Sequence, residues 1–381
     1  MRIAIVHSFY SSENPSGENQ AVLAQADALR GAGHEVILIA RHTDDERSRG
    51  LYTLRAGISV AFFRGVSPEQ ELRAFQPDII HVHNLFPNWG SSWMKVWSDR
   101  TVVTLHNYRT VCPSGILWRD GASCTLCLDN GTLESVRHRC YRGSAVATLP
   151  LALASRQRGK RSPLLRHSAC VVVLNSDALD LYRELMPSTS VELVPNFVED
   201  VEYRSASLHD SWIFAGRLVP EKGILWLLDN WPASEKLKIL GSGPLEREVQ
   251  DIASGQPDQF EFLGPVSSEK ARRLIGSAKG LVLPSLWSEG IPTVALEALQ
   301  AGTPLLVSDR CSAVAELLSN RSGVSLRIEE GVRGLDNAMK VVVADQEYRQ
   351  RARSRFVSEF SESVWLERME EIYSRVAGLK V

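Results

Sequence analysis

Long hydrophobic runs and a strong net charge are both missing from this sequence of 381 residues. No stretch approaches the ~20 consecutive apolar residues that a membrane-spanning helix needs. The opening MRIAIVHSFY becomes polar too early for a secretory signal peptide. The formal net charge is only -2, which argues against nucleic-acid binding because that function needs a strongly basic face. We therefore expect a cytoplasmic protein that binds no nucleic acid.

Cysteine is also scarce, with six residues in the chain. Four of them fall in one segment with the spacing C-x11-C-x2-C-x12-C, namely Cys112, Cys124, Cys127 and Cys140. In a reducing cytosol, clustered cysteines bind metal more often than they form disulfides, and four thiolates could hold a structural zinc ion. An iron–sulfur cluster and four reduced or redox-active thiols are the alternatives. Cys170 and Cys311 lie in apolar surroundings and are expected in the core.

The sequence does contain a regular alternation of short apolar runs and helical patterns. Hydrophobic residues make up 44% and charged residues 23% of the chain, as in globular proteins, and the length favours two domains. The apolar runs predict buried parallel strands at 2–8, 35–41, 78–84, 101–107, 170–176, 211–217, 236–242, 260–266, 280–286 and 303–309. We expect an α/β protein with two doubly wound parallel sheets, in domains spanning 1–200 and 205–361.

Polar residues and glycines follow several of these strands. In the first half they are His7, His81, His83 and His106, and in the second half Gly216-Arg217, Gly241 to Gly243 and Glu289-Gly290. Ligands bind beyond the carboxyl ends of parallel strands, so these residues are candidates for a site in a cleft between the two domains. The alternative for each histidine is a purely structural hydrogen bond.

Two segments of the second half suit phosphate binding. FAGRLVPEKG places Arg217 at a strand end and Lys222 five residues later, and guanidinium and ammonium groups both pair with phosphate oxygens. LGSGPLEREV is a glycine-rich turn around Gly243 that opens a helix. With only two glycines, it is a weak dinucleotide signal on its own.

A third segment, SEGIPTVALEALQAGTP, carries two glutamates, Glu289 and Glu297, on either side of a helix start. Pro292 is expected in the first turn of that helix. The backbone amides near Gly290 and Ile291 would then point towards the cleft and its ligand.

Together and in this order, these segments resemble the retaining, nucleotide-sugar-dependent glycosyltransferases of family 4, the glycosyl transferases of group 1. The signature of that family, two glutamates separated by seven residues, is matched by Glu289 and Glu297. The PSGENQ loop resembles the family's glycine loop near the donor. Many members carry Gly-Gly in this loop, whereas this sequence has Ser16 before Gly17. The resemblance implies the GT-B fold, in which two Rossmann-like domains face each other across a cleft.

The resemblance also implies a role for each matching residue. Glu297 matches the acid that accepts hydrogen bonds from the ribose hydroxyls of the nucleotide, and Glu289 the one that holds the donor sugar. Arg217 and Lys222 match the pair that neutralises the departing diphosphate, and His106 matches the histidine beside the transferred sugar. The expected catalytic residues are therefore His106, Arg217, Lys222 and Glu289. The remaining donor-binding positions are Gly17, Gly216, Gly243, Gly290, Ile291, Pro292 and Thr293.

The function that the resemblance implies is transfer of a sugar from a nucleoside-diphosphate sugar to a hydroxyl of a glycan or lipid-linked saccharide, with retention, in cell-surface polysaccharide biosynthesis. Metal-dependent glycosyltransferases usually carry Asp-x-Asp, which this sequence lacks, so we expect no catalytic divalent metal. A nucleotide-sugar epimerase or a phosphorylase of the same fold is the alternative. A zinc-ribbon module around 112–140 that binds nucleic acid is a more distant one.

Three further segments bear on the acceptor and on the domain limits. The cysteine-containing insert at 107–143 is expected to border the acceptor. The basic stretch RQRGKRSPLLRH at 156–167 suits an anionic membrane surface, which would place the enzyme on the inner face of the cell membrane; a solvated charge run is the alternative. By the same resemblance, the C-terminal helix at 362–381 packs back on the first domain.

Overall fold

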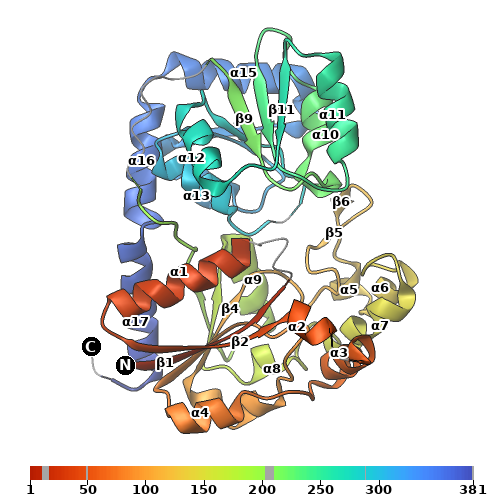
Figure 1. The fold of residues 1–381 in the computed structure, drawn as a ribbon, viewed down its shortest axis with the longest axis vertical. Helices are drawn as coiled ribbons and strands as arrows, with labels where there is room; N and C mark the ends of the chain where they lie inside the picture. Colours follow the sequence, from red (N-terminus) through yellow and green to blue (C-terminus); the bar gives the residue numbers. More distant parts are fainter. Residues whose placement is uncertain (11–16, 49, 202–209, 288, 380–381) are drawn as a thin grey trace. The chain divides into compact units, whose positions relative to one another are not determined.

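The chain folds into two units, each built around a parallel sheet (Figure 1). The computed structural model describes residues 1–10, 17–48, 50–201, 210–287 and 289–379. Unit 1 comprises Met1–Arg119, Cys124–Pro195 and Trp365–Val381, and unit 2 comprises Asp120–Ser123 and Asn196–Val364. The domain limits of 1–200 and 205–361, expected from the sequence, remain a prediction.

The sheet of unit 1 has the strand order β2-β1-β3-β4-β7-β8, and its paired strands run parallel. Its strands are β1 (Arg2–Phe9), β2 (Glu35–His42), β3 (Ile79–Asn84), β4 (Thr101–Leu105), β7 (Cys170–Val173) and β8 (Ser190–Leu193). The insert adds a small two-stranded sheet of β5 (Trp118–Arg119) and β6 (Ala122–Ser123). Central strands such as β3 are buried along their whole length, which explains their uninterrupted apolar runs.

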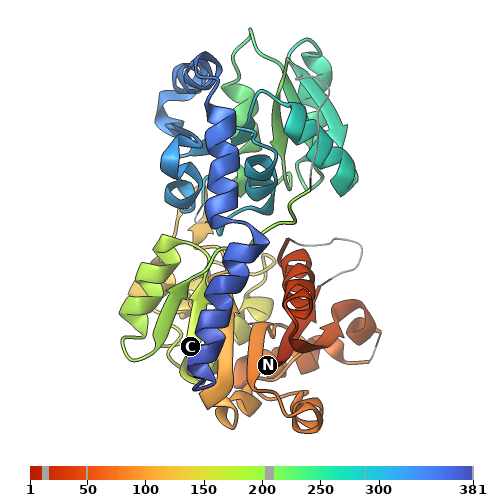
Figure 2. The ribbon, with the colours of Figure 1, turned by 90° about the vertical axis from the view of Figure 1, so that its left-hand side faces the viewer.

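The helices of unit 1 connect these strands and cover the sheet. They are α1 (Gly17–Gly31), α2 (Thr43–Arg47), α3 (Tyr52–Phe62), α4 (Glu69–Phe75), α5 (Leu126–Asp129), α6 (Leu133–Arg137), α7 (Ala145–Ala154), α8 (Pro163–Arg166), α9 (Ser176–Leu185) and the C-terminal α17 (Glu362–Val376). Figure 2 shows the blue C-terminal helix running along the strands of unit 1. Tyr373 in α17 donates or accepts a 2.7 Å hydrogen bond with Nδ1 of His81 in β3, so this helix is part of unit 1.

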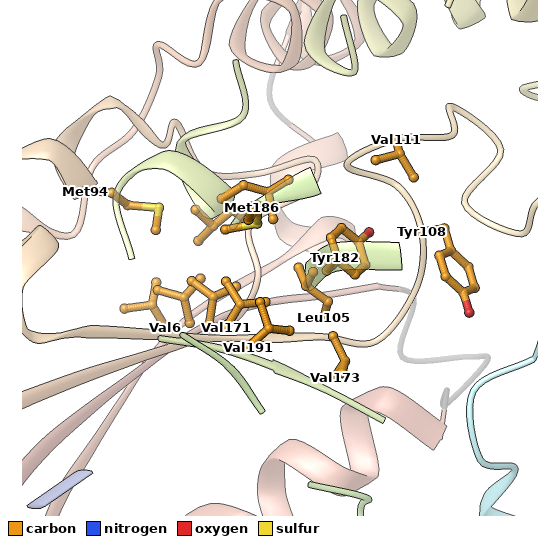
Figure 3. Close-up of a cluster of buried hydrophobic side chains, with 14 of the residues drawn as sticks. Val6, Met94, Leu105, Tyr108, Val111, Val171, Val173, Tyr182, Met186 and Val191 are labelled. Carbon is orange, nitrogen blue, oxygen red and sulfur yellow. The ribbon is translucent and has the colours of Figure 1, made fainter. Parts of the chain in front are cut away.

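Apolar side chains from the central strands of unit 1 pack against the helices on one side of the sheet. Figure 3 shows this cluster, in which Val171 and Val173 of β7 lie near Tyr182 of α9 and near Met186, the residue that follows α9. The Tyr182 hydroxyl lies 2.6 Å from Oγ1 of Thr110. The loop after β4 is therefore fastened to the core of unit 1, and that loop follows directly on His106.

The sheet of unit 2 has the order β11-β10-β9-β12-β13-β14, again with parallel pairing. Its strands are β9 (Trp212–Ala215), β10 (Leu237–Leu240), β11 (Phe260–Gly264), β12 (Leu281–Leu283), β13 (Leu305–Ser308) and β14 (Gly323–Leu326). Its helices are α10 (Ile224–Asp229), α11 (Glu246–Gly255), α12 (Ser268–Ser277), α13 (Thr293–Gln300), α14 (Val314–Leu318), α15 (Gly331–Ala344) and α16 (Tyr348–Glu359).

The two faces of the unit 2 sheet bury separate apolar clusters. Along β9, Trp212 and Phe214 belong to one cluster, while Ile213 and Ala215 belong to the other. This alternation follows from the two-residue period of a strand, and it requires helices on both faces. Two doubly wound parallel sheets are thus confirmed.

Candidate functional site

The loops after β9 and β10 approach each other so closely in unit 2 that only glycine fits between them. Gly241 and Gly243 both have positive φ values, 134° and 156°. A Cβ atom at Gly241 would overlap the carbonyl oxygen of Gly216, and one at Gly243 would lie 2.5 Å from the carbonyl oxygen of Leu218. The glycines therefore draw the two strand ends together and leave backbone exposed at this edge.

Arg217 and Lys222 lie on the loop that leaves β9, but in different environments. The Arg217 side chain is 67% exposed, with Nη2 3.9 Å from Oε1 of Glu221. Lys222 ends a 3-10 turn, Pro220–Lys222, and its side chain is only 16% exposed. Burial and the nearby charge of Arg217 lower the pKa of Lys222 to about 8.

Lys222 is joined to Glu289, one of the two predicted glutamates. Its Nζ donates to Oε1 of Glu289, and contact with this carboxylate favours the protonated ammonium. Ser285 donates from Oγ to Oε2 of the same carboxylate over 2.7 Å. Ser312 donates to the Glu289 carbonyl oxygen over 2.6 Å. The two serines thus fix the glutamate and, through it, the lysine.

The helix α13 begins beside this pair. Pro292 is its N-cap residue, with φ −67° and ψ 131°, so the helix starts at Thr293, one residue later than expected. Ile291 is buried in the apolar cluster of unit 2. Its side chain is therefore a core residue, which leaves only its backbone and that of Gly290 for contact with a ligand.

Glu297 lies within α13 and is separate from the Lys222–Glu289 pair. Its Oε1 accepts a hydrogen bond from Nε of Arg272 over 3.3 Å. Burial raises the pKa of Glu297, and the positive charge of Arg272 acts in the opposite direction. The sequence did not predict Arg272, because an arginine inside a helical pattern looks like an ordinary solvated residue.

The predicted histidines of unit 1 form a buried group at the ends of β1, β3 and β4. Nδ1 of His83 lies 2.9 Å from Nε2 of His106. His81 bonds Oγ1 of Thr104 over 2.7 Å and the Tyr373 hydroxyl over 2.7 Å. His7 lies 3.0 Å from Oδ1 of Asn19. His7 and His81 are thus held by structural partners, while His83 orients His106.

Burial keeps these four histidines neutral at pH 7. Desolvation lowers the pKa of His106 and of His81 to about 3 and that of His7 to about 4. The pKa of His83 is also lowered well below its ordinary value, first by burial and then by the neighbouring imidazoles. A neutral imidazole can donate one hydrogen bond and accept another, which suits the polar atoms of a ligand.

Glu18 is a candidate residue that sequence reasoning missed. It lies in the first turn of α1, where acidic residues are common because they suit the helix dipole. Its Oε1 is buried without a hydrogen-bond partner among the described residues. Burial raises the pKa of this carboxyl to about 7, against the opposing effects of Asn84 and Arg109. Of the PSGENQ loop, Gly17 opens α1 and is exposed, while Ser16 lies outside the described residues.

A pocket of about 100 Å³ in unit 1 opens beside His83 and His106. Apolar side chains form most of its wall: Phe63, Leu85, Phe86, Trp89, Leu105, Leu151 and Leu164. Asn84, Asn107 and Arg109 add polar groups, and the Arg109 guanidinium stacks 4.4 Å from the centre of the Phe86 ring. The pocket can thus hold a ligand with both apolar and hydroxyl-bearing parts.

The cysteine cluster does not support the zinc prediction. Among the described residues, Cys112, Cys124, Cys127 and Cys140 form no disulfide. Within the described residues, no group of three or more His, Cys, Asp or Glu side chains is arranged to hold a metal ion. Burial, followed by the neighbouring cysteines, raises the pKa of Cys127 to about 12, and Cys112 bonds Ser114 over 3.1 Å. The described side chains thus give the zinc prediction no support.

The membrane-related segments also differ from expectation in detail. In 156–167 the basic residues Arg156, Arg158, Lys160, Arg161 and Arg166 are exposed. Leu165 is buried and Leu164 packs against the core of unit 1, so neither leucine is available as an apolar anchor. Among the described residues, no helix has the length and apolar character to cross a membrane.

Comparisons with known proteins agree with this architecture. A model of Glycosyltransferase Family 4 matches residues 15–202, and a model of Glycosyl transferases group 1 matches residues 209–345. A phosphatidyl-myo-inositol mannosyltransferase from Mycolicibacterium smegmatis is 26% identical over an alignment that covers 100% of this chain and 96% of that protein.

Solved structures show the same fold at lower identity. A sucrose-phosphate synthase from Thermosynechococcus elongatus has a TM-score of 0.69 and 17% identity, with 99% of each chain covered. The Anabaena protein HepE, solved in complex with UDP-glucose, has a TM-score of 0.61 and 13% identity, with coverage of 98% of this chain and 100% of that chain. The chain therefore belongs to the family 4 glycosyltransferases of group 1, and it is a transferase enzyme with the two Rossmann-like domains of the GT-B fold.

Proposed function

We propose that this glycosyltransferase moves a sugar from a nucleoside-diphosphate sugar to a hydroxyl of a glycan or lipid-linked saccharide, with retention of anomeric configuration, in polysaccharide or glycolipid biosynthesis. The observation that carries the proposal is the Arg217, Lys222 and Glu289 group at the strand ends of unit 2. It combines two cationic side chains with a buried carboxylate, next to the loops that Gly241 and Gly243 allow to approach closely. The relative solved with UDP-glucose supports a nucleotide-sugar donor.

In this proposal the cations act on the leaving group. The bond between the anomeric carbon and the diphosphate oxygen breaks, and negative charge grows on that oxygen. Arg217, which is exposed, and Lys222, which Glu289 holds in place, stabilise that charge more strongly in the transition state than in the ground state, which lowers the barrier. The sequence contains no Asp-x-Asp, so we assign this task to the two side chains rather than to a divalent metal.

The two glutamates hold different parts of the donor. Glu297 accepts hydrogen bonds from ribose hydroxyls, for which its buried carboxylate, oriented by Arg272, is suited. Glu289 binds the hydroxyls of the transferred sugar while keeping Lys222 in place. The backbone of Gly17, Gly216, Gly243, Gly290, Ile291, Pro292 and Thr293 completes the proposed donor contacts.

We assign the acceptor to unit 1. His106 has a neutral imidazole that His83 orients, and it borders the apolar pocket. An acceptor with a lipid part and a sugar hydroxyl matches a pocket that is lined by both apolar and polar side chains. The basic residues of 156–167 would favour an anionic membrane surface, which places the enzyme at the cytoplasmic face of the membrane. The mannosyltransferase relative, named for phosphatidyl-myo-inositol, supports a membrane acceptor.

A donor screen tests the function. The purified enzyme is incubated with UDP-, GDP-, ADP- and dTDP-sugars and a membrane lipid extract, and the product is characterised by NMR for anomeric configuration. We expect one donor class to give a glycosylated lipid with retention, and Arg217→Ala to reduce its formation about 100-fold or more. Product formation without an acceptor would indicate an epimerase, and a strict requirement for inorganic phosphate would indicate a phosphorylase. An inverted product would refute retention.

A further inference from the structure

The helices α3 and α7 pack against each other in unit 1 (Figure 1). Both present apolar side chains to solvent. A Cβ atom at Gly57 of α3 would lie 3.6 Å from Cγ of Pro150 in α7, which shows how closely they approach. The exposed residues are Leu51, Leu54, Ile58, Phe62, Val146 and Leu149, which we call the apolar face. The side chains of Phe62 and Val146 are 63% and 83% exposed, so neither residue belongs to the core of unit 1.

The apolar face follows the helical period. Leu51, Leu54, Ile58 and Phe62 are spaced by three and four positions and so lie on one side of α3. The neighbouring residues Ser59, Val60 and Phe63 turn inwards and line the pocket beside His106. Likewise Leu151 and Ala154 of α7 line that pocket. The same two helices therefore form the outer surface and the pocket wall.

The two segments that carry this face have charge of one sign. Residues 50–66 and 135–167 contain no Asp or Glu. Their basic residues are Arg55, Arg64, Arg137, Arg139, Arg142, Arg156, Arg158, Lys160, Arg161 and Arg166. All of these are exposed, although Arg158 lies 3.5 Å from Glu184. Acidic residues stand on the neighbouring helices, Asp44, Asp45 and Glu46 on α2 and Glu134 on α6. The whole chain has 43 basic and 45 acidic residues, so the basic excess belongs to these two segments.

We propose that the apolar face docks on a bilayer that contains anionic phospholipid. Apolar side chains on the outside of a helix, together with arginines and lysines on the same segments, are the features that hold a helix in the headgroup region of such a bilayer. The proposal deepens the proposed function and rests on it for one point: a lipid-linked acceptor held in the bilayer would be presented to the pocket beside His106, whose wall the same two helices help to form.

This docking surface differs from the one expected from sequence. The stretch 156–167 contributes basic residues only, because its leucines are buried or packed on the core. The apolar anchors come instead from α3 and α7. An apolar protein partner would explain the exposed side chains of these helices, but it would not explain the exclusion of acidic residues from both segments.

Vesicle sedimentation without donor or acceptor tests the proposal. The full-length protein is mixed with vesicles of phosphatidylcholine alone or of equimolar phosphatidylcholine and phosphatidylglycerol. We expect binding to the anionic vesicles, weakened by salt, and much weaker binding to phosphatidylcholine alone. Phe62→Glu and Val146→Glu should each reduce the partition coefficient at least tenfold. Neutralising an arginine that flanks the apolar face, such as Arg55 or Arg142, should reduce it about fivefold.

A matched control is Val343→Glu in α15 of unit 2. Val343 is also an exposed apolar residue, and its substitution should leave vesicle binding unchanged. Melting temperatures establish that each variant is folded. Wild-type binding by Phe62→Glu and Val146→Glu, or no wild-type binding to either vesicle, would overturn the proposal. So would a dimer in lipid-free solution that these variants dissociate, since the face would then bind a second copy. Vesicle binding without any sugar transfer would refute the proposed function and leave the docking face intact.

Discussion

The Glu297 carboxylate illustrates how one side chain of α13 is prepared for a ligand. Its Oε1 accepts a hydrogen bond from Nε of Arg272 at 3.3 Å, and in the proposed function the carboxylate also accepts hydrogen bonds from the ribose hydroxyls. Hydrogen bonds to a charged acceptor are worth about 1.5–3 kcal/mol. The residue is thus expected to contribute to nucleotide affinity more than to the chemical step.

Replacing this acid tests that assignment. Glu297→Gln should weaken binding of the cognate nucleoside diphosphate about tenfold while leaving turnover at saturating donor almost unchanged. Isothermal titration and steady-state kinetics measure the two effects. Glu269→Gln, an exposed acid in α12, serves as the control and should behave as wild type. A large fall in turnover with unchanged affinity would assign Glu297 to catalysis instead.

The buried Glu18 carboxyl predicts a second effect, on stability. Its pKa is raised from 4.5 to about 7 in the folded protein, so its stabilising contribution is complete below pH 4.5 and is lost as the pH rises through 7. Glu18→Gln should therefore be more stable than wild type at pH 8, by up to about 3 kcal/mol, and equally stable near pH 4. Denaturant unfolding at both pH values measures this. The same dependence of unfolding free energy on pH for wild type and variant would contradict this prediction. The control is Glu71→Gln in α4, because Glu71 is exposed.

At the scale of the elements, the sequence predicted every strand of the two large sheets except β8 (SVEL) and β14 (GVSL). Both lie at an edge of their sheet and are only partly buried. The edge strands β2 and β11 were predicted because they keep a longer or more strongly apolar run. In β8 and β14 each apolar residue stands beside a serine, glutamate or glycine, so they lack the hydrophobic signal of a strand covered on both faces.

Sequence reasoning singled out His106, Lys222 and Glu289 for the candidate site because they follow strands or match a family motif. It did not single out Glu18 and Arg272, because burial and charge pairing depend on contacts between residues far apart in sequence. The zinc prediction from cysteine spacing finds no support in the described residues, since spacing does not fix how thiols are oriented.

The C-terminal helix offers a test at this scale. Tyr373 of α17 makes a 2.7 Å hydrogen bond to the buried His81 of β3. Tyr373→Phe removes one partner and leaves Nδ1 of His81 unsatisfied, which should lower the free energy of unfolding by about 1–3 kcal/mol. Tyr348→Phe in α16 is the control, because no hydrogen bond of the Tyr348 hydroxyl is found within the described ranges, and it should cost much less. Equal losses for the two variants would mean that α17 is not held in this way.

At the scale of the whole molecule, the histidine group predicts how stability depends on acid. His7, His81, His83 and His106 have folded pKa values below the ordinary 6.5, so their contribution is complete above pH 6.5 and is lost as the pH falls. Each contributes about 1.4 kcal/mol per pH unit between its folded and unfolded values. The raised pKa values of Glu18 and Glu297 act on stability in the opposite direction, but these two carboxyl groups offset at most two of the four histidines. Denaturant unfolding from pH 7 to 5 should show a steep fall, which His83→Gln reduces; a flat profile would contradict the buried neutral group.

The central claim concerns the diphosphate, because both the family motif and the geometry of unit 2 converge on Arg217 and Lys222. The most direct measurement is isothermal titration of wild type and Arg217→Met with the cognate nucleoside diphosphate and with the same nucleoside lacking phosphates. Arg217 is exposed, so the variant should fold normally, and Arg247→Met in α11 is the matched control. We predict that Arg217→Met weakens diphosphate binding about tenfold or more and leaves nucleoside binding unchanged. Equal affinity of wild type and variant for the diphosphate would contradict the account.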